Sequence, residues 1–153
     1  MRIKAEASGD RAHRCFLIGH RDADESLTPA LDAAIERHIT ECGVTEFVVG
    51  HYGNFDRLAA RALARARARH PEIRLFLLTP YYSPEHPLPL PEGFDATLYP
   101  EGIEDAPRRL AIVYANRYMV EASLYLIAFV RHSFGNTGKL LAYAQTRCRI
   151  ERI

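Results

Sequence analysis

The sequence predicts an α/β protein with a Rossmann-like, doubly wound, mainly parallel sheet of about five strands, flanked by helices on both faces. Short apolar runs alternate with segments of helical periodicity, the order that is typical of βαβ units. The chain has 153 residues, of which 48% are hydrophobic and 25% charged, so its size and composition fit one globular domain. We therefore expect a flexible leader over residues 1–13 and a single Rossmann-like domain over residues 14–153.

The first half is predicted to hold two strands, each followed by a helix, over residues 14–18, 28–42, 45–49 and 54–70. Gly19 and Gly50 stop the two apolar runs, which read as buried strands. Pro29 suits the first turn of the first helix, and Pro71 ends the second helix because proline restricts the residue before it.

The second half continues the alternation around a proline-rich interruption. Strands are predicted at 73–79 and 123–130, helices at about 107–121 and 137–147, with short additional strands at 95–98 and near the C-terminus. Seven of the nine prolines lie between Pro80 and Pro107, where few positions suit a regular helix or sheet. We expect a long loop over 80–107, and the sequence leaves its role open.

Composition excludes several classes of protein. The net charge of +1 argues against the broad basic surface of a non-specific nucleic-acid binder, so a nucleic-acid partner is not expected. The three cysteines have no metal-ligand or disulfide spacing, and no apolar run is long enough to span a membrane. We expect a cytoplasmic protein without a membrane partner, metal or cofactor.

Polar, glycine-rich segments follow the predicted strands. Gly19, His20 and Arg21 follow the first predicted strand, and residues 50–54, which include two glycines, follow the second. Because the carboxyl ends of parallel strands meet at one edge, and glycine turns and helix N-termini expose amide donors there, this edge favours a phosphate or carboxylate. The predicted ligand-binding residues are Gly19, His20, Arg21, Gly50, Tyr52, Gly53, Asp56, Asn116, Arg117, Gly135, Asn136 and Thr137.

Common catalytic signatures are absent from this edge. Neither a Walker loop nor a GxGxxG fingerprint occurs, which disfavours an ATPase or a standard dinucleotide site. His20, His51 and His132 lie on three different loops without metal-binding spacing, so hydrogen bonding is the expected role of these side chains. Asp56 and Glu121 are the candidate carboxylates for acid–base catalysis.

The second predicted helix carries an arginine stripe. Arg57, Arg61 and Arg65 recur every four residues opposite the apolar face, and Arg67 and Arg69 follow them. A solvated face is the ordinary interpretation of such a stripe, and a patch for RNA or an acidic partner is the alternative.

Four segments together resemble the SLOG superfamily, in particular its short single-domain bacterial members of the YpsA type. They read CFLIGHR, GHYGNFDRLAA, NRYM and GNTGKLLAYA, at residues 15–21, 50–60, 116–119 and 135–144. More distant relatives in this superfamily are the cytokinin-activating phosphoribohydrolases (LOG proteins) and the Rossmann domain of the DNA-processing protein DprA. The resemblance implies a Rossmann-like sheet and a pocket for a nucleotide or a nucleotide-derived ligand.

The sequence departs from the LOG pattern at two catalytic positions. LOG enzymes carry an arginine four residues before a methionine like Met119, and a glutamate three residues after a threonine like Thr137. Here these positions hold Ala115 and Leu140, and the PGG before the threonine is absent. Unless the alignment slips by a residue, in which case Arg117 is the obvious stand-in, both catalytic groups are missing, so the hydrolase chemistry is not carried over.

Three functions follow as expectations. The first is binding of a small phosphate-bearing, nucleotide-derived ligand, as a sensor or effector module, with Arg21 on phosphate and His20 and Tyr52 on base or sugar. The second is N-glycosidic hydrolysis of a nucleoside monophosphate, as in a phosphoribohydrolase. The third is nucleic-acid binding through the arginine-rich helix. A homo-oligomer is compatible with each of them.

Overall fold

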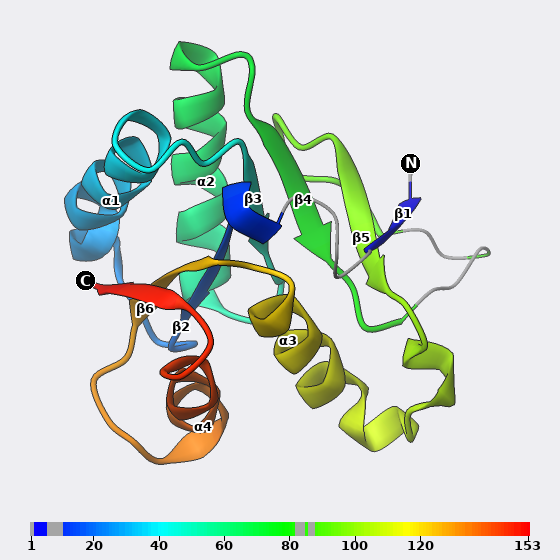
Figure 1. Ribbon diagram of the computed structural model, residues 1–153. Coiled ribbons are helices and arrows are strands. Elements are labelled where there is room, and N and C mark those ends of the chain that lie inside the picture. Colours follow the sequence, from blue (N-terminus) through cyan, green and yellow to red (C-terminus); the bar gives the residue numbers. More distant parts are fainter. Residues whose placement is uncertain (1, 6–10, 82–84, 86–87) are drawn as a thin grey trace.

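A seven-stranded parallel sheet forms the centre of the molecule (Figure 1). The computed structural model describes residues 2–5, 11–81, 85 and 88–153. Within these residues the strands are β1 (Arg2–Ala5), β2 (Arg14–Gly19), β3 (Glu46–Val49), β4 (Arg74–Leu78), β5 (Ala96–Pro100), β6 (Tyr125–Phe129) and β7 (Arg149–Arg152). Their order is β1-β5-β4-β3-β2-β6-β7, and every pairing is parallel. The predicted Rossmann-like α/β class is confirmed.

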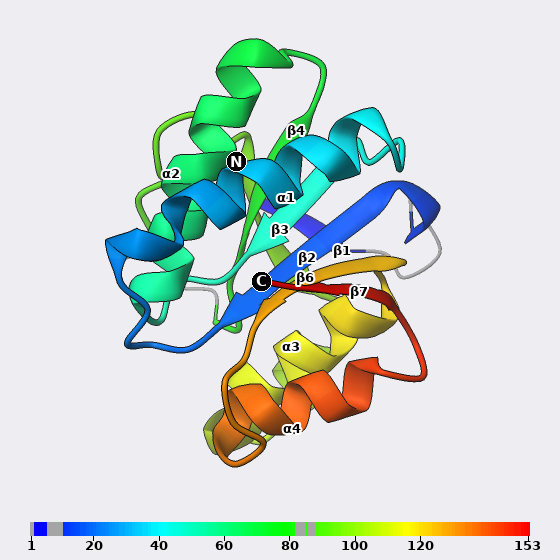
Figure 2. The same cartoon turned by 90° about the vertical axis from the view of Figure 1, so that its left-hand side faces the viewer.

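Helices cover both faces of the sheet. They are α1 (Thr28–Thr40), α2 (Asn54–Arg69), α3 (Ala111–Glu121) and α4 (Gly135–Ala144). Figure 2 shows α1 and α2 on one side of the sheet and α3 and α4 on the other. Within the described residues, no helix combines the length and the apolar character that crossing a membrane requires.

Each face of the sheet has its own apolar core, and β2 contributes to both. Cys15 and Leu17 pack with the residues of α1 and α2, whereas Phe16 and Ile18 pack with those of α3 and α4. Successive side chains of a strand point to opposite faces, so a strand covered on both faces must be apolar throughout. This explains why β2 reads as an uninterrupted apolar run.

The chain reverses its direction of travel across the sheet beside β2. Strands β2 to β5 follow one another outward, and the chain then returns to place β6 and β7 on the opposite side of β2. In sheets of this kind, ligands bind outside the carboxyl ends of the strands at such a switch point. The loops after β2, β3 and β6 meet there.

A buried ion pair closes the opposite, amino-terminal edge. The Nε of Arg14 lies 3.0 Å from Oε2 of Glu46, and both side chains are buried. Arg14 also donates from Nη1 to the carbonyl oxygen of Ala122, at 2.7 Å. The pair therefore joins β2, β3 and the end of α3.

Several boundaries differ from the predictions. Residues 2–5, placed by the sequence in a flexible leader, form β1, which pairs with β5. The predicted 80–107 loop contains the whole of β5, of which the sequence predicted a part at 95–98, and the 3₁₀ helix Ile103–Asp105, while residues 82–84 and 86–87 lie outside the described residues. A second 3₁₀ helix, Arg108–Leu110, delays the start of α3 to Ala111. The short C-terminal strand is present as β7.

Candidate functional site

A pocket lies at the switch point, on the face of the sheet that α3 and α4 cover. It encloses about 110 Å³. Its polar lining comes from the end of β2 and the loops after β2 and β3, from α3 and from the first turns of α2 and α4. It consists of Gly19, Arg21, Gly50, Tyr52, Gly53, Asp56, Asn116, Asn136 and Thr137. The structure therefore brings most of the predicted ligand-binding residues into one cavity, although they are far apart in the sequence.

Two glycines allow the first two loops to pack against each other. A Cβ atom on Gly53 would lie 2.7 Å from the Cα of Arg21, and one on Gly19 would lie 2.2 Å from the Phe55 ring. The backbone N–H of Asn54 donates to the carbonyl oxygen of Arg21, at 3.0 Å. These contacts hold Arg21 at the start of α2 and beside the pocket.

Asp56 is the carboxylate in the pocket lining. Its Oδ2 accepts a hydrogen bond from the backbone N–H of Tyr52, at 2.8 Å, which fixes its orientation. Burial raises the pKa of Asp56 to about 6, against the opposing effects of the Tyr52 amide, the Arg21 charge and the Gly53 amide. The carboxyl group therefore changes protonation state close to neutral pH.

Tyr52 and His51 follow β3 but have different surroundings. Burial raises the pKa of Tyr52 to about 12, so its phenol stays neutral and can donate a hydrogen bond into the pocket. His51 donates from Nδ1 to the carbonyl oxygen of Leu78, at 3.2 Å, and burial lowers its pKa. His51 therefore ties its loop to β4, and it is not among the residues that line the pocket.

The first turn of α4 supplies backbone donors. Its N-cap residue, Phe134, makes no capping side-chain hydrogen bond, and Asn136 and Thr137 line the pocket. The first N–H groups of a helix have no intrahelical partner and carry the positive end of the helix dipole. Gly135 has φ +81°, which only glycine adopts readily, and it lets the loop turn into the helix.

His20 lies outside the pocket and joins two loops. It is 7% exposed, and its Nε2 accepts a hydrogen bond from the backbone N–H of Arg131, at 2.8 Å. Burial lowers the pKa of His20, and the neighbouring His132 lowers it further. A neutral His20 with its proton on Nδ1 therefore holds the loop after β6 against the loop after β2, where the sequence predicted a direct ligand contact.

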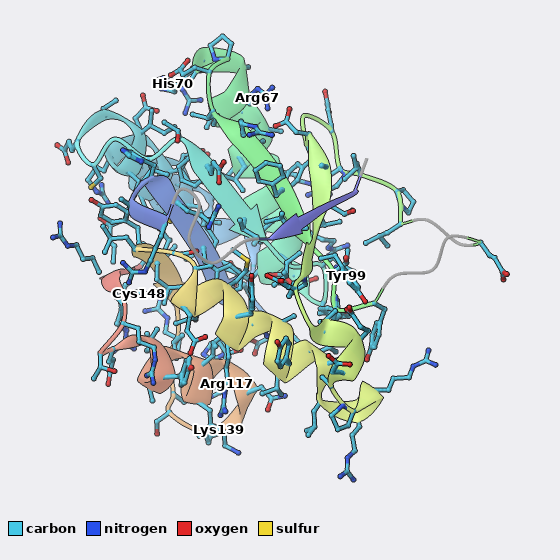
Figure 3. All side chains as sticks on the ribbon, turned by 45° about the vertical axis from the view of Figure 1, so that its right-hand side comes forward. Arg67, His70, Tyr99, Arg117, Lys139 and Cys148 are labelled. Carbon is cyan, nitrogen blue, oxygen red and sulfur yellow. The ribbon has the colours of Figure 1, made fainter. Side chains whose placement is uncertain are left out.

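Three other predicted residues are not among those that line the pocket. Arg117 is exposed, with its guanidinium 5.0 Å from the centre of the Tyr143 ring, and Figure 3 shows it beside α4. Glu121 lies at the far end of α3, where it accepts a hydrogen bond from the Tyr143 hydroxyl. Gly135 is exposed at the start of α4. The catalytic candidates Asp56 and Glu121 are therefore not brought together.

The apolar part of the lining was missed by the sequence predictions. It includes Phe16, Ile18, Leu78, Pro80, Ile112, Ala115 and Leu140. Among these residues are Ala115 of α3 and Leu140 of α4, the two positions at which the sequence departs from the LOG pattern that it was expected to resemble. In this protein both positions are apolar and both face the pocket.

Three of the five arginines on α2, the three nearest its C-terminal end, pair with acidic side chains. Nitrogen-to-oxygen distances are 2.9 Å for Arg65 with Asp32, 2.6 Å for Arg67 with Asp95 and 3.4 Å for Arg69 with Glu36. Figure 3 shows Arg67 near the end of α2 that is far from the pocket. Ion pairs of this kind compete with phosphate for the guanidinium groups, which weakens the case for nucleic-acid binding.

Neither a metal site nor a similar known protein points to a function for this pocket. In the part of the chain that the structure describes, no three His, Cys, Asp or Glu residues are placed to hold a metal ion. Comparison with protein-family models gives no match, and comparison with curated proteins gives none either. The fold and the site therefore define a class: a parallel α/β domain with a polar pocket at its switch point.

Proposed function

We propose that the protein binds a nucleotide or a nucleotide-derived ligand in this pocket and acts as a sensor or effector module. One observation carries the proposal: Arg21 and the uncapped first turn of α4 line the same apolar-walled pocket. A guanidinium and free helix N–H groups are the donors that bind phosphate well. Among the described residues Arg21 makes no ion pair, unlike Arg65, Arg67 and Arg69 of α2.

The remaining lining suits a sugar next to that phosphate. Asp56 accepts hydrogen bonds and Tyr52 donates one, so the two can bind ribose hydroxyl groups. Ile112 and Leu140 provide an apolar surface for the sugar ring. The enclosed volume of about 110 Å³ is well below the roughly 300 Å³ of a pocket for a drug-sized ligand, so the base would lie at the mouth.

Calorimetric titration with AMP, ADP-ribose, NAD and cyclic dinucleotides tests the proposal. We expect at least one of them to bind, and Arg21→Ala to weaken that binding by about 10- to 100-fold, because a charge-assisted hydrogen bond contributes about 1.5–3 kcal/mol. Arg61→Ala is the matched control, since Arg61 is exposed on α2 and does not line the pocket. Absence of binding to a folded sample, or equal losses in both variants, would refute the proposal.

A second candidate function is hydrolysis of an N-glycosidic bond. The observation that favours it is the pKa of Asp56, about 6, because a general acid or base works best when its pKa is near the operating pH. Ala115 and Leu140, apolar where the LOG enzymes carry catalytic side chains, weigh against it. The test is release of free base from nucleoside monophosphates by the wild type and by Asp56→Asn. Absence of release by the wild type removes this candidate and leaves ligand binding in place.

A further inference from the structure

Three aromatic rings form a continuous stack beside the start of α4. The rings of His20 and His132 are 4.2 Å apart between centroids and 18° from parallel. The rings of His132 and Phe134 are 3.8 Å apart and 11° from parallel. The stack begins at the buried His20 and ends at Phe134, which is 71% exposed. A large apolar ring at the end of such a stack presents aromatic surface to solvent.

The stack is held in place from within the protein. His20 accepts the Arg131 N–H and meets Phe129 edge to face at a centroid distance of 5.7 Å. His132 donates from Nδ1 to the carbonyl oxygen of Phe134, at 3.1 Å. The orientation of the Phe134 ring is therefore set before a ligand arrives, which lowers the entropy cost of stacking on it.

Phe134 is also within reach of the pocket. It is the N-cap residue of α4, and Asn136, two residues later, lines the pocket. Two trans peptide units span at most about 7 Å between Cα atoms. The Cα atoms of Phe134 and Asn136 are therefore within about 7 Å of each other, a separation that a base attached to a phosphate through one sugar can span.

We propose that Phe134 is the stacking platform for the base of the bound ligand, so that the site selects a base-bearing nucleotide over a sugar phosphate without a base. This inference rests on the proposed function, because it assumes that the phosphate binds at α4. Stacking between a base and an aromatic side chain is tolerant of base identity, since every base has a flat face. Phe134 therefore distinguishes ligands with a base from ligands without one. A purine, which has the larger face, binds more tightly than a pyrimidine.

Binding of AMP and of ribose 5-phosphate, measured by calorimetry, tests this inference. We expect AMP to bind the wild type at least tenfold more tightly than ribose 5-phosphate, and Phe134→Ala to remove most of that difference while leaving ribose 5-phosphate binding unchanged. Phe134→Tyr keeps the aromatic face and should keep the preference. Tyr114→Ala is the control, because Tyr114 is an exposed aromatic residue of α3 that does not line the pocket.

A fluorescent variant provides a second measurement that does not require removing the ring. The chain contains no tryptophan, so Phe134→Trp introduces a single indole emitter at the platform. We expect AMP to quench its emission and ribose 5-phosphate to leave it unchanged, whereas Tyr114→Trp should respond to neither compound.

The outcomes separate the two proposals. Equal affinity of the wild type for AMP and ribose 5-phosphate, an equal loss for both in Phe134→Ala, or unquenched emission in a Phe134→Trp variant that binds AMP would overturn the platform and leave the proposed function standing. If neither compound binds the wild type, the platform is overturned, whereas the proposed function fails only if ADP-ribose, NAD and the cyclic dinucleotides do not bind either.

Discussion

Replacing Asp56 with asparagine should stabilise the fold at neutral and alkaline pH. The half-buried carboxyl group receives the Tyr52 amide hydrogen bond, yet burial raises its pKa to about 6 from 3.8, so the folded protein holds the ionised form unfavourably. Asparagine has nearly the same shape, keeps an oxygen that can accept the Tyr52 N–H, and carries no charge. The substitution therefore removes the cost of ionisation and retains the geometry.

The size of the effect follows from the two pKa values. The interval from 3.8 to about 6 corresponds to about 3 kcal/mol of unfolding free energy at pH 8, since one pH unit is worth about 1.4 kcal/mol. Because the pKa of the folded state is the higher one, this stability is present below pH 3.8 and is lost as the pH rises through about 6. The advantage of Asp56→Asn should therefore be largest at pH 8 and nearly vanish at pH 3.5.

Urea unfolding of both proteins between pH 3.5 and pH 8 measures this difference directly. Asp32→Asn is a matched control, because Asp32 is on the surface of α1 and pairs with Arg65. An Asp56→Asn advantage that does not change with pH, or a loss of stability at pH 8, would show that burial does not penalise the charged form and would refute the reasoning.

Three further predictions concern the stability of the sheet and of the loops around the pocket. Arg14→Ala leaves the Glu46 carboxylate buried without its main partner and should lower the unfolding free energy by about 3–5 kcal/mol in urea titrations. The double variant Arg14→Met with Glu46→Leu should lose much less unfolding free energy, and an equal loss would contradict this account. Gly138→Ala places a Cβ 2.4 Å from the Ser133 carbonyl oxygen, so a lower melting temperature and weaker ligand binding are expected, and unchanged values would show that the loop relaxes freely. Burial lowers the pKa of His20 from 6.5, so its contribution to stability is complete above pH 6.5 and is lost as the pH falls below that value. Chemical unfolding of His20→Gln should therefore show a smaller loss of stability than the wild type as the pH falls below 6.5, and an unchanged pH dependence would contradict this account.

The central part of the fold could be predicted because its signals are local and strong. The apolar run of β2 and the helical period of α2 each follow from burial on known faces. The two edge strands gave weaker signals, because Arg2–Ala5 and Arg149–Arg152 are each only four residues long and partly polar in sequence. Strand β5 was predicted only in part, as residues 95–98, because it lies within a proline-rich segment.

Prediction of the site was limited by side-chain direction. The rule that loops meet at the carboxyl edge identified Gly19, Gly53 and Thr137, all of which line the pocket. It could not separate His20 from its neighbours, because the direction of one side chain in a loop depends on tertiary contacts. Arg117 follows Asn116 on the same helix, and a step of one residue turns the side chain by about 100°, so only one of the two lines the pocket.

The apolar lining could not be predicted for a different reason. Ala115, Ile112 and Leu140 belong to helices whose apolar faces pack on the sheet, and a pocket wall made of such residues has the same sequence pattern as the core. Only the spacing between α3, α4 and the ends of the strands makes part of that face accessible to a ligand.

The position of β2 between β3 and β6 also determines when the pocket can form during synthesis. Gly19 pairs with Phe129, more than 100 residues later in the chain, whereas Phe16 and Leu17 pair with Val48 and Val49. A nascent chain can assemble β2, β3 and the α1–α2 layer first, but one side of β2 stays without a partner until β6 leaves the ribosome. The proposed ligand could therefore bind only after β6 and α4 have joined the sheet, and its binding would favour that last step of folding.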